Sequence, residues 1–391
     1  MKTRNQIIFT SLALLLTITS LLYKTPTSFI KAETVQNVSS PLHTSVQRDR
    51  NDLKQAMQDT LQLGVPGILA KISENGQTWA YAAGVADQST QKPMNADFRF
   101  RIGSVTKTFI ATVVLQLAGE NRLNLDDSIE KWLPGVIQGN GYDGKQITIR
   151  QLLNHTSGIA EYSKSKDVDV MNTKKSYTAK EIVEIGLSLP PEFSPGNGWS
   201  YSNTGYVILG ILIEKVTGNS YAEEIEGRII EPFELSNTFL PGNSTVIPGA
   251  NHARGYLQRG SELKDVTYYN PSIGSSAGDM ISTADDLNKF FSALLGGKLL
   301  KENQLKQMLT SVPTGKKSLD NYGLGIYEIK LQNGSSVWGH AGSIPGFCTL
   351  VGGTLGGNHT LAVNINYMGE FNIMSSFNNI FLAEFGDQAR R

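Results

Sequence analysis

Residues 104–118 read SVTKTFIATVVLQLA, a hydroxyl and an amine three positions apart at the start of an almost wholly apolar run. An α-helix repeats every 3.6 residues, so Ser104 and Lys107 share one face and can form a hydrogen bond. The residues that follow are too uniformly apolar for a surface helix. The segment therefore predicts a buried helix with the Ser104 and Lys107 side chains at its mouth.

Ser104 and Lys107 admit two interpretations. A serine is a poor nucleophile at neutral pH unless an adjacent base accepts its proton, and a lysine whose charged form is disfavoured by burial can be that base. The same spacing also arises where a serine caps a helix and a lysine lies on the solvated first turn. These residues alone do not decide between a catalytic pair and a helix cap.

A second group of polar side chains lies in the segment WSYSN, residues 199–203, just before an apolar run typical of a helix. Tyr201 can offer a phenolic oxygen for proton transfer, and Asn203 can offer an amide that orients a substrate. The alternative is a surface turn in which Asn203 caps the following helix.

A third group is WGHAGS, residues 338–343. On a strand, His340 and Gly342 face the same side, and a glycine lets a ligand approach the backbone closely. Backbone N–H groups on such an edge can bind an oxyanion or pair with a peptide. The alternative is that His340 is a satisfied core or edge residue without chemistry.

Strand signals occur only near the two ends of the chain. Those near the beginning are at 67–72 and 78–83, around a Glu-Asn-Gly turn, and those near the end are at 322–331, 335–338, 349–354 and 360–365. The stretch between them, roughly 104–300, reads as mostly helical, and a last helix extends to about Phe385. We therefore expect an α+β fold, an α/β sandwich in which both chain ends build one antiparallel sheet with flanking helices. The helical region is inserted in the middle, and the active site is expected in the cleft between the two.

The N-terminus resembles a segment that is removed. Residues 1–32 combine early basic residues, an apolar stretch and a possible cut after Ala32, which is typical of a secretory signal peptide. Residues 33–50 are expected to be a flexible arm, and 51–391 the catalytic domain. The apolar stretch is also near the lower length limit for an uncleaved membrane anchor.

Charge and cysteine content exclude several classes of function. The 35 basic and 35 acidic residues leave no excess charge to attract nucleic acid. The single cysteine, Cys348, cannot form an internal disulfide, and no Cys/His cluster has the spacing of zinc ligands. We therefore expect no metal and no cofactor, and no stable membrane association after signal cleavage.

Taken in this order, the three groups resemble the penicillin-recognising serine hydrolases. The similarity is to the branch that holds class C β-lactamases, D-alanyl-D-alanine carboxypeptidases, D-aminopeptidases and alkaline D-peptidases, and it covers the chain from about residue 50. It extends to LLNHTSG at 152–158, to 201–218 and to SAG at 276–278. Within this branch the chain looks most like secreted alkaline D-peptidases and D-alanyl-D-alanine carboxypeptidases.

The resemblance implies a role for each site residue. Ser104 would be the acylated nucleophile, with Lys107 as its proton acceptor or electrostatic partner. Tyr201 would be the general base and the acid for the leaving amine, and Asn203 would bind the substrate amide. The backbone N–H groups of Ser104 and Ser343 would form the oxyanion hole. Which of Lys107 and Tyr201 takes the first proton stays open, because coupled groups titrate as a unit.

The resemblance also implies the substrates: D-amino-acid peptides, peptides derived from peptidoglycan, and β-lactams. Class C β-lactamases typically carry Lys-Thr-Gly where this chain has His340, Ala341 and Gly342. A histidine is mostly uncharged at neutral pH, and Ala341 lacks a hydroxyl, so a substrate carboxylate loses both partners. This favours a D-peptidase that also cleaves internal bonds, amides or esters over a strict carboxypeptidase.

Other functions remain open at this point. A class C-like β-lactamase or esterase of the same fold, or a penicillin-binding sensor without turnover, would share these motifs. Residues 274–278, GSSAG, match the nucleophile elbow of α/β-hydrolases, with His340 or His359 as the histidine. The elbow needs a strand before it and a helix after it, whereas a proline precedes it here and the next helix is predicted only at Thr283. His155 is expected to satisfy backbone groups.

Overall fold

The computed structural model describes residues 49–168, 174–316, 319–331, 334, 336–369 and 373–386. The predicted signal peptide, 1–32, and all but the last two residues of the predicted arm, 33–50, lie outside these residues. The described residues from Asp49 onward cluster as one compact unit.

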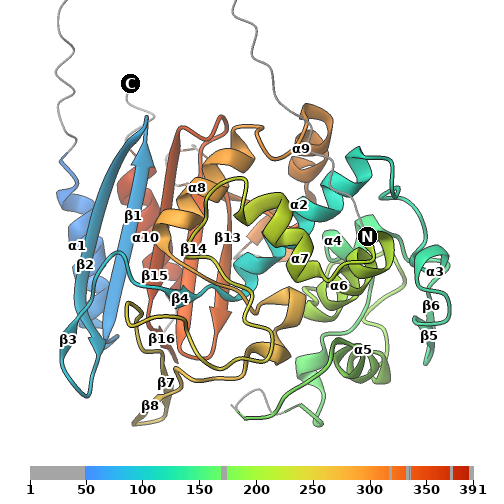
Figure 1. Cartoon of the computed structure of the whole chain (residues 1–391), viewed down its shortest axis with the longest axis horizontal. Helices are drawn as coiled ribbons and strands as arrows, with labels where there is room; N and C mark the ends of the chain where they lie inside the picture. The colour runs from blue at the N-terminus through green and yellow to red at the C-terminus, as the bar shows by residue number, and fades with distance from the viewer. Residues whose placement is uncertain are drawn as a thin grey trace, which may run out of the picture. The chain divides into compact units, whose positions relative to one another are not determined.

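Within the described residues, nine strands form one antiparallel sheet in the order β10-β11-β12-β13-β14-β15-β1-β2-β3 (Figure 1). The strands are β1 (Gly67–Glu74), β2 (Gln77–Asp87), β3 (Lys92–Pro93), β10 (Val312–Lys316), β11 (Leu319–Tyr322), β12 (Tyr327–Lys330), β13 (Ser336–Ile344), β14 (Phe347–Gly353) and β15 (His359–Ile365). Strand β1 pairs with β15, with Ile68 opposite Ile365. The two ends of the chain thus build one sheet, and the predicted α+β fold is confirmed.

The predicted turn between β1 and β2 follows from its two residues. Asn75 and Gly76 both have positive φ, 51° and 80°, which is the conformation of a two-residue hairpin turn whose twist matches that of the strands. Glu74 lies opposite Gln77, so the turn sets the register of the whole hairpin.

Helices cover both faces of the sheet. Helices α1 (Asn51–Gln62) and α10 (Ile373–Phe385) pack on one face, and α8 (Ala284–Leu295) packs on the other against β1, β14 and β15 (Figure 1). The remaining helices form the inserted region; they are α2 (Thr106–Gly119), α3 (Ile129–Trp132), α4 (Ile149–Leu153), α5 (Ala179–Ser188), α6 (Asn203–Thr217), α7 (Tyr221–Ile225) and α9 (Glu302–Leu309).

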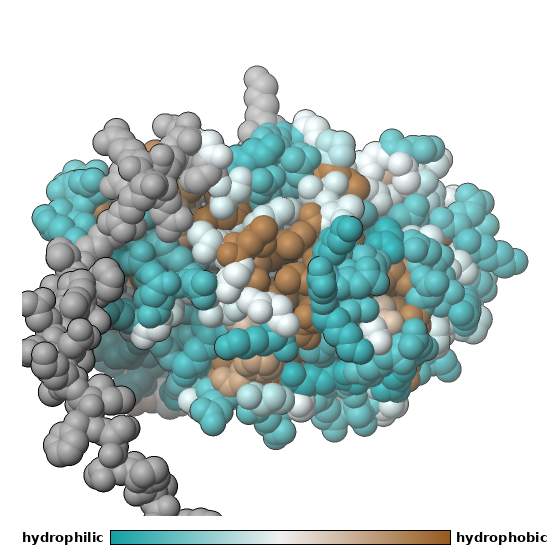
Figure 2. Space-filling view, turned by 90° about the horizontal axis from the view of Figure 1, so that it is seen from above, coloured by the Kyte–Doolittle hydropathy of each residue, from teal (hydrophilic) through white to brown (hydrophobic). Residues whose placement is uncertain are grey.

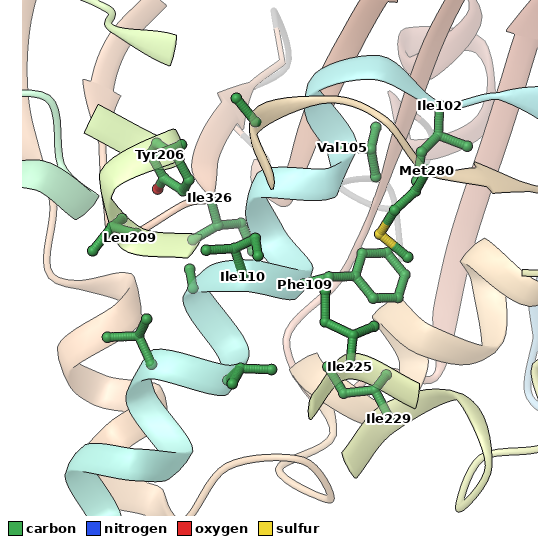
Figure 3. Close-up of a cluster of buried hydrophobic side chains, with 14 of the residues drawn as sticks. Ile102, Val105, Phe109, Ile110, Tyr206, Leu209, Ile225, Ile229, Met280 and Ile326 are labelled. Atoms are coloured by element: carbon green, nitrogen blue, oxygen red, sulfur yellow. The ribbon is translucent and has the colours of Figure 1, made fainter. Parts of the chain in front are cut away.

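Helix α2 is buried on nearly all sides, as its composition predicts. Its Phe109 and Ile110 belong to a hydrophobic cluster with Leu209 of α6, Met280 and Ile326 (Figure 3). The Phe109 ring also stacks on Phe290 of α8 with centroids 3.7 Å apart. Helix α8 also covers the sheet. Its contact with Phe109 therefore holds the start of α2 in place between the sheet layer and the helical region.

Two parts of the expected strand pattern are wrong. The inserted region contains a hairpin, β7 (Tyr256–Arg259) and β8 (Glu262–Asp265), which also pairs with β16 (Tyr367–Met368). Short strand pairs also join β4 (Phe100–Arg101) to β9 (Ile281–Ser282), and β5 (Gln138–Gly139) to β6 (Tyr142–Asp143).

The predicted strand at 322–331 is interrupted between β11 and β12. Gly325 has a φ of 72°, and its carbonyl accepts a hydrogen bond of 2.7 Å from Thr108 Oγ1 of α2. A Cβ at this position would lie 2.5 Å from Ala111 Cβ. The chain therefore leaves the sheet to contact α2, and only a glycine fits there.

Four charged or polar side chains link the first described helix to the last. The Arg50 guanidinium donates hydrogen bonds of 3.1–3.2 Å to the Glu384 carboxylate and one of 2.6 Å to Glu74. His359 Nε2 lies 2.8 Å from Glu384 Oε1. The two carboxylates and His359 have ligand atoms close enough to hold a metal ion, but Arg50 already supplies the positive charge there.

Figure 2 shows one face of the molecule, on which hydrophilic residues predominate and hydrophobic residues gather near the middle. In the described part of the chain, no helix has both the length and the hydrophobicity needed to cross a bilayer. Of the large exposed apolar side chains, Met374 at the start of α10 lines the cleft described next.

Candidate active site

Ser104 lies in a single 3-10 turn, η1 (Gly103–Val105), that continues directly into α2. Lys107 follows one turn later, and its Nζ is 3.1 Å from Ser104 Oγ. The residue that caps α2 is Val105, which makes no side-chain capping hydrogen bond. Ser104 is therefore not the helix cap that its spacing also allowed.

Lys107 is fully buried at the centre of the site. Its Nζ donates hydrogen bonds to Asn203 Oδ1 (2.6 Å) and to the Ala277 carbonyl (2.8 Å), besides Ser104 Oγ. Burial lowers the pKa of Lys107 to about 7, against the opposing effect of the Glu161 carboxylate. Near neutral pH a large fraction of Lys107 is thus a free amine that can accept a proton.

Tyr201 and Asn203 lie on either side of the start of α6. Burial raises the pKa of Tyr201 above its usual value, and the hydrogen bond with Ser104 only partly offsets this. Tyr201 therefore keeps its phenolic proton, and its ring centroid is 4.9 Å from Lys107 Nζ. The cap of α6 is Ser202, which accepts from Gly205 N–H, so the amide of Asn203 is free to bind Lys107.

Glu161 is a part of the site that the sequence patterns did not identify. Its Oε2 accepts a hydrogen bond of 2.5 Å from the backbone N–H of Asn203, and its Oε1 accepts one of 3.0 Å from Asn203 Nδ2. This double contact turns Asn203 Oδ1 toward Lys107. The sequence signal for Glu161 was its position directly after the apolar pair Ile159-Ala160. A charged residue in such a place is expected to be buried, and a buried charge usually has a specific partner.

His340 on β13 is almost fully buried, and both of its ring nitrogens are engaged. Nδ1 is 2.5 Å from the Ala341 carbonyl oxygen, and Nε2 is 2.7 Å from the Tyr322 hydroxyl. Burial and, to a smaller extent, the charge of Lys107 lower the pKa of His340 to about 3. His340 therefore supplies no positive charge to the site near neutral pH.

Two glycines bring β13 against the turn that carries Ser104. A Cβ on Gly342 would lie 1.9 Å from the Ile102 carbonyl oxygen and 3.0 Å from Ser104 N, and one on Gly103 would lie 2.9 Å from the Ser343 backbone. The backbones of Ser104 and Ser343 are thus neighbours, which is the arrangement that an oxyanion hole needs.

One edge of β13 is open to a ligand beside Ser104. Strand β12 pairs with β13 only as far as Gly339, and among the described strands the rest of β13, through Ile344, pairs only with β14. An extended peptide can add to such an edge by main-chain hydrogen bonds.

A cleft of about 830 Å³ begins at this edge. Its reactive end holds Ser104, Tyr201, His340 and Ser343. The rest is mainly apolar with a charged rim and is lined by Leu319, Asp320, Tyr322, Tyr327, Glu328, Ile329, Lys330, Ala341, Leu350, Met374, Ser375 and Asn378. The structure thus brings together all seven candidate residues, namely Ser104, Lys107, Tyr201, Asn203, His340, Gly342 and Ser343.

His155 supports the loop that carries Tyr201. It has a φ of 63°, and its Nδ1 accepts a hydrogen bond of 3.2 Å from Ser202 N–H. Its ring centroid lies 4.3 Å from that of Tyr201. His155 satisfies a backbone group, as expected, and in addition packs directly against a candidate catalytic side chain.

The alternative nucleophile Ser276 is not in an elbow. It is buried in a 3-10 turn, η5 (Ser275–Ala277), and its Oγ donates a hydrogen bond of 2.9 Å to the Tyr206 carbonyl of α6. The second candidate histidine of that hypothesis, His359, contacts Glu384 instead. Neither the local structure nor the contacts of Ser276 fit an α/β-hydrolase.

The fold and the site together define a class: α+β proteins with a serine, a lysine and a tyrosine in a cleft between a sheet and a helical region. The family model described as Beta-lactamase matches residues 50–376. This chain belongs to the β-lactamase family.

Relatives and solved structures agree with this assignment. Penicillin-binding protein 4* of Bacillus subtilis (strain 168) is 28% identical over 284 residues, which is 69% of this chain and 61% of that protein. The chain thus spans less than two thirds of that relative. A D-stereospecific amidohydrolase from Streptomyces sp. has a TM-score of 0.80 and 39% identity, covering 86% of this chain and 99% of that one. The D-amino acid amidase from Ochrobactrum anthropi SV3, complexed with L-phenylalanine, has a TM-score of 0.79 and 28% identity, covering 87% and 100%.

Proposed function

We propose that this protein is a secreted serine hydrolase that cleaves D-amino-acid-containing peptides and amides through an acyl-enzyme. The observation that carries the proposal is the buried Lys107 amine, held between Ser104 Oγ, Asn203 Oδ1 and the Ala277 carbonyl with a lowered pKa. The names of the similar structures, a D-stereospecific amidohydrolase and a D-amino acid amidase, support the choice of D-substrates.

The first step is attack by Ser104. Neutral Lys107 accepts the Ser104 proton, and Oγ forms a bond to the carbonyl carbon of the substrate. The carbonyl oxygen takes up the negative charge beside the backbone N–H groups of Ser104 and Ser343. Asn203 keeps Lys107 in place and offers its amide to the substrate.

Tyr201 acts on the leaving group. Because burial keeps its phenol protonated, Tyr201 donates its proton to the departing nitrogen, and the proton that Lys107 took from Ser104 then restores the phenol. The C–N bond breaks, an amine leaves, and Ser104 carries the acyl group. A water molecule then follows the same proton route in reverse and releases the acid.

Substrates with an uncharged group on the leaving side fit this site best. His340 is neutral and Ala341 has no hydroxyl, so positions 340 and 341 offer neither a positive charge nor a hydroxyl to a terminal carboxylate. Substrates with an internal peptide bond, an amide or an ester avoid the cost of placing an unpaired carboxylate in the cleft. Peptides derived from peptidoglycan fit this preference where the scissile bond is internal or the leaving end is amidated.

Two other functions share the geometry. A class C-like β-lactamase or esterase would use the same residues, and a penicillin-binding protein would be acylated without rapid turnover. The name of the Bacillus subtilis relative favours testing the second of these. Both are separated from a D-peptidase by the substrates that are turned over.

The test is one substrate panel on one enzyme preparation. We expect steady turnover of D-phenylalanyl amide and D-phenylalanyl oligopeptides, weaker cleavage of a D-Ala-D-Ala peptide and a cephalosporin, and none of the L-peptides. Ser104→Ala should abolish turnover. Ser276→Ala should still turn over the D-substrates, because it leaves Ser104 in place. Cleavage of only L-peptides or only the cephalosporin, a single burst without turnover, or full activity of Ser104→Ala would each contradict the proposal.

A further inference from the structure

His340 and Tyr322 form a buried hydrogen-bond chain beside the cleft. The Tyr322 hydroxyl is 2.7 Å from His340 Nε2, and His340 Nδ1 is 2.5 Å from the Ala341 carbonyl oxygen. Tyr322 is fully buried, and the two rings are perpendicular with centroids 5.8 Å apart. The segment 340–342 does not by itself point to Tyr322, which lies on another strand.

These two hydrogen bonds determine which protonation state of His340 fits. A carbonyl oxygen only accepts hydrogen bonds, so Nδ1 must carry a proton. In a neutral ring Nε2 is then an acceptor, and the Tyr322 hydroxyl is its donor. A hydrogen bond donated to the neutral form of a group disfavours its charged form.

Of the other groups around His340, Lys107 acts in the same direction, whereas the Ala341 carbonyl favours the charged form. Lys107 on α2 disfavours a second positive charge, and His155 lies 4.7 Å from the Tyr322 ring, centroid to centroid. The Tyr327 ring packs 5.3 Å from His340, while its hydroxyl is bonded to the Ala341 backbone. The Tyr206 hydroxyl also forms a hydrogen bond with the Tyr322 hydroxyl. Because Tyr206 donates its own proton to the Leu153 carbonyl, it can only accept from Tyr322, and it competes with His340 Nε2 for that proton.

The position of Tyr322 depends on the interruption of the predicted strand. Tyr322 is the last residue of β11 and is opposite Tyr327, the first residue of β12. The connection between them leaves the sheet at Gly325 to contact α2. This placement holds the Tyr322 hydroxyl over the middle of β13, where it reaches His340 rather than solvent.

We propose that Tyr322 is a specificity-determining positioning residue: by donating to His340 Nε2 it adds to burial and to Lys107 in holding His340 neutral, so the cleft rejects substrates with a free carboxylate next to the scissile bond. This inference rests on the proposed hydrolase function and adds the residue that sets its preference. A charged His340 would stand where that carboxylate lies and would accept it, because Ala341 offers no alternative partner.

The experiment uses two substrates that differ in one group, D-phenylalanyl-D-phenylalanine amide and the same dipeptide with a free carboxylate. The ratio of their kcat/KM values is measured from pH 5 to 9 for the full chain as exported, for Tyr322→Phe and for Tyr327→Phe. Histidine labelled with ¹⁵N reports the protonation state and tautomer of His340 by NMR. Tyr327→Phe is the matched control, because it removes a hydroxyl close to His340 that does not bond to its ring.

We expect the wild-type ratio to favour the amide and to stay constant with pH, with His340 in the Nδ1–H form throughout. In Tyr322→Phe, His340 should take up a proton at higher pH, and the relative kcat/KM for the free acid at pH 5.5 should rise about fivefold. Tyr327→Phe should leave the His340 signals unchanged.

Three results would overturn the inference: a protonated His340 in the wild type at pH 7, an equal response of the two variants, or a wild-type ratio that falls steeply on acidification. The NMR of the wild type needs no variant to fold and no substrate to be cleaved. If neither dipeptide is cleaved while His340 has the neutral Nδ1–H form, the proposed function fails and the hydrogen-bond assignment stands.

Discussion

Glu161 shows how much of the site depends on one charged residue outside the three motifs. Both of its carboxylate oxygens bind Asn203, and its negative charge opposes the loss of the Lys107 proton. It thus acts on Lys107 in two ways, through the direction of Asn203 Oδ1 and through the pKa of Lys107.

The pH dependence of catalysis follows from this arrangement. In the proposed mechanism activity needs neutral Lys107, whose pKa is about 7, so kcat/KM should rise as the pH increases through that value. In Glu161→Gln the charge that raises this pKa is lost, so the midpoint should move to lower pH. The amide also presents a donor to Asn203, so we expect the maximal kcat/KM to fall about 10- to 100-fold. A pH–rate profile measures both effects.

Glu192→Gln is the matched control for this prediction. Glu192 binds Lys164 at the surface through one carboxylate oxygen, so its substitution should leave the pH profile unchanged. A profile of Glu161→Gln that shifts to higher pH would contradict the electrostatic role.

At the scale of elements, the site depends on how closely β13 approaches the η1 turn. A Cβ at Gly342 meets backbone atoms on the opposite side, which cannot move as a flexible side chain can. The substitution Gly342→Ala should therefore push β13 away from Ser104 and misplace the Ser343 N–H. Loss of one oxyanion donor typically lowers kcat about 10²- to 10³-fold, and we expect a decrease of that size in steady-state kinetics.

Gly227→Ala provides the comparison. A Cβ there meets nothing within 4 Å, and Gly227 does not have a positive φ. It should keep kcat/KM and the thermal midpoint of the parent. If Gly342→Ala also kept full activity, the close approach would not contribute to catalysis.

At the scale of the whole molecule, the ends of the chain hold the sheet together. Arg50 precedes α1, Glu74 ends β1, His359 begins β15 and Glu384 lies in α10, and their contacts close the outer face of the sheet. Arg50→Met leaves the buried Glu384 carboxylate without its guanidinium partner. Breaking a buried pair in this way should lower the free energy of unfolding by about 3 kcal/mol in urea titrations.

Lys180→Met is the control for stability. Lys180 forms an exposed pair with Glu184 on the same helix, so its loss should change the free energy of unfolding by less than about 0.5 kcal/mol. An Arg50→Met protein as stable as the parent would show that the network does not stabilise the fold.

Local patterns were enough to predict the fold class and the candidate residues. The apolar run after Lys107 predicts a buried helix, Asn75-Gly76 predicts its hairpin, and the runs near both ends predict an antiparallel sheet. These signals are carried by neighbours in the chain, through helical period, turn conformation and side-chain alternation. The strand at 322–331 was mispredicted because its interruption depends on a contact with α2, far away in sequence.

The chemistry of the site was decided by contacts that no local pattern records. Lys107 reaches Asn203 across 96 positions and Ala277 across 170, and its pKa falls because the fold removes it from water. Glu161 and Tyr322 carry no motif, yet one directs Asn203 and the other contacts His340. The sequence alone thus indicated which residues are candidates for carrying the reaction. Only the tertiary structure decided their protonation states, because burial and distant hydrogen-bond partners set the free energy of each charge.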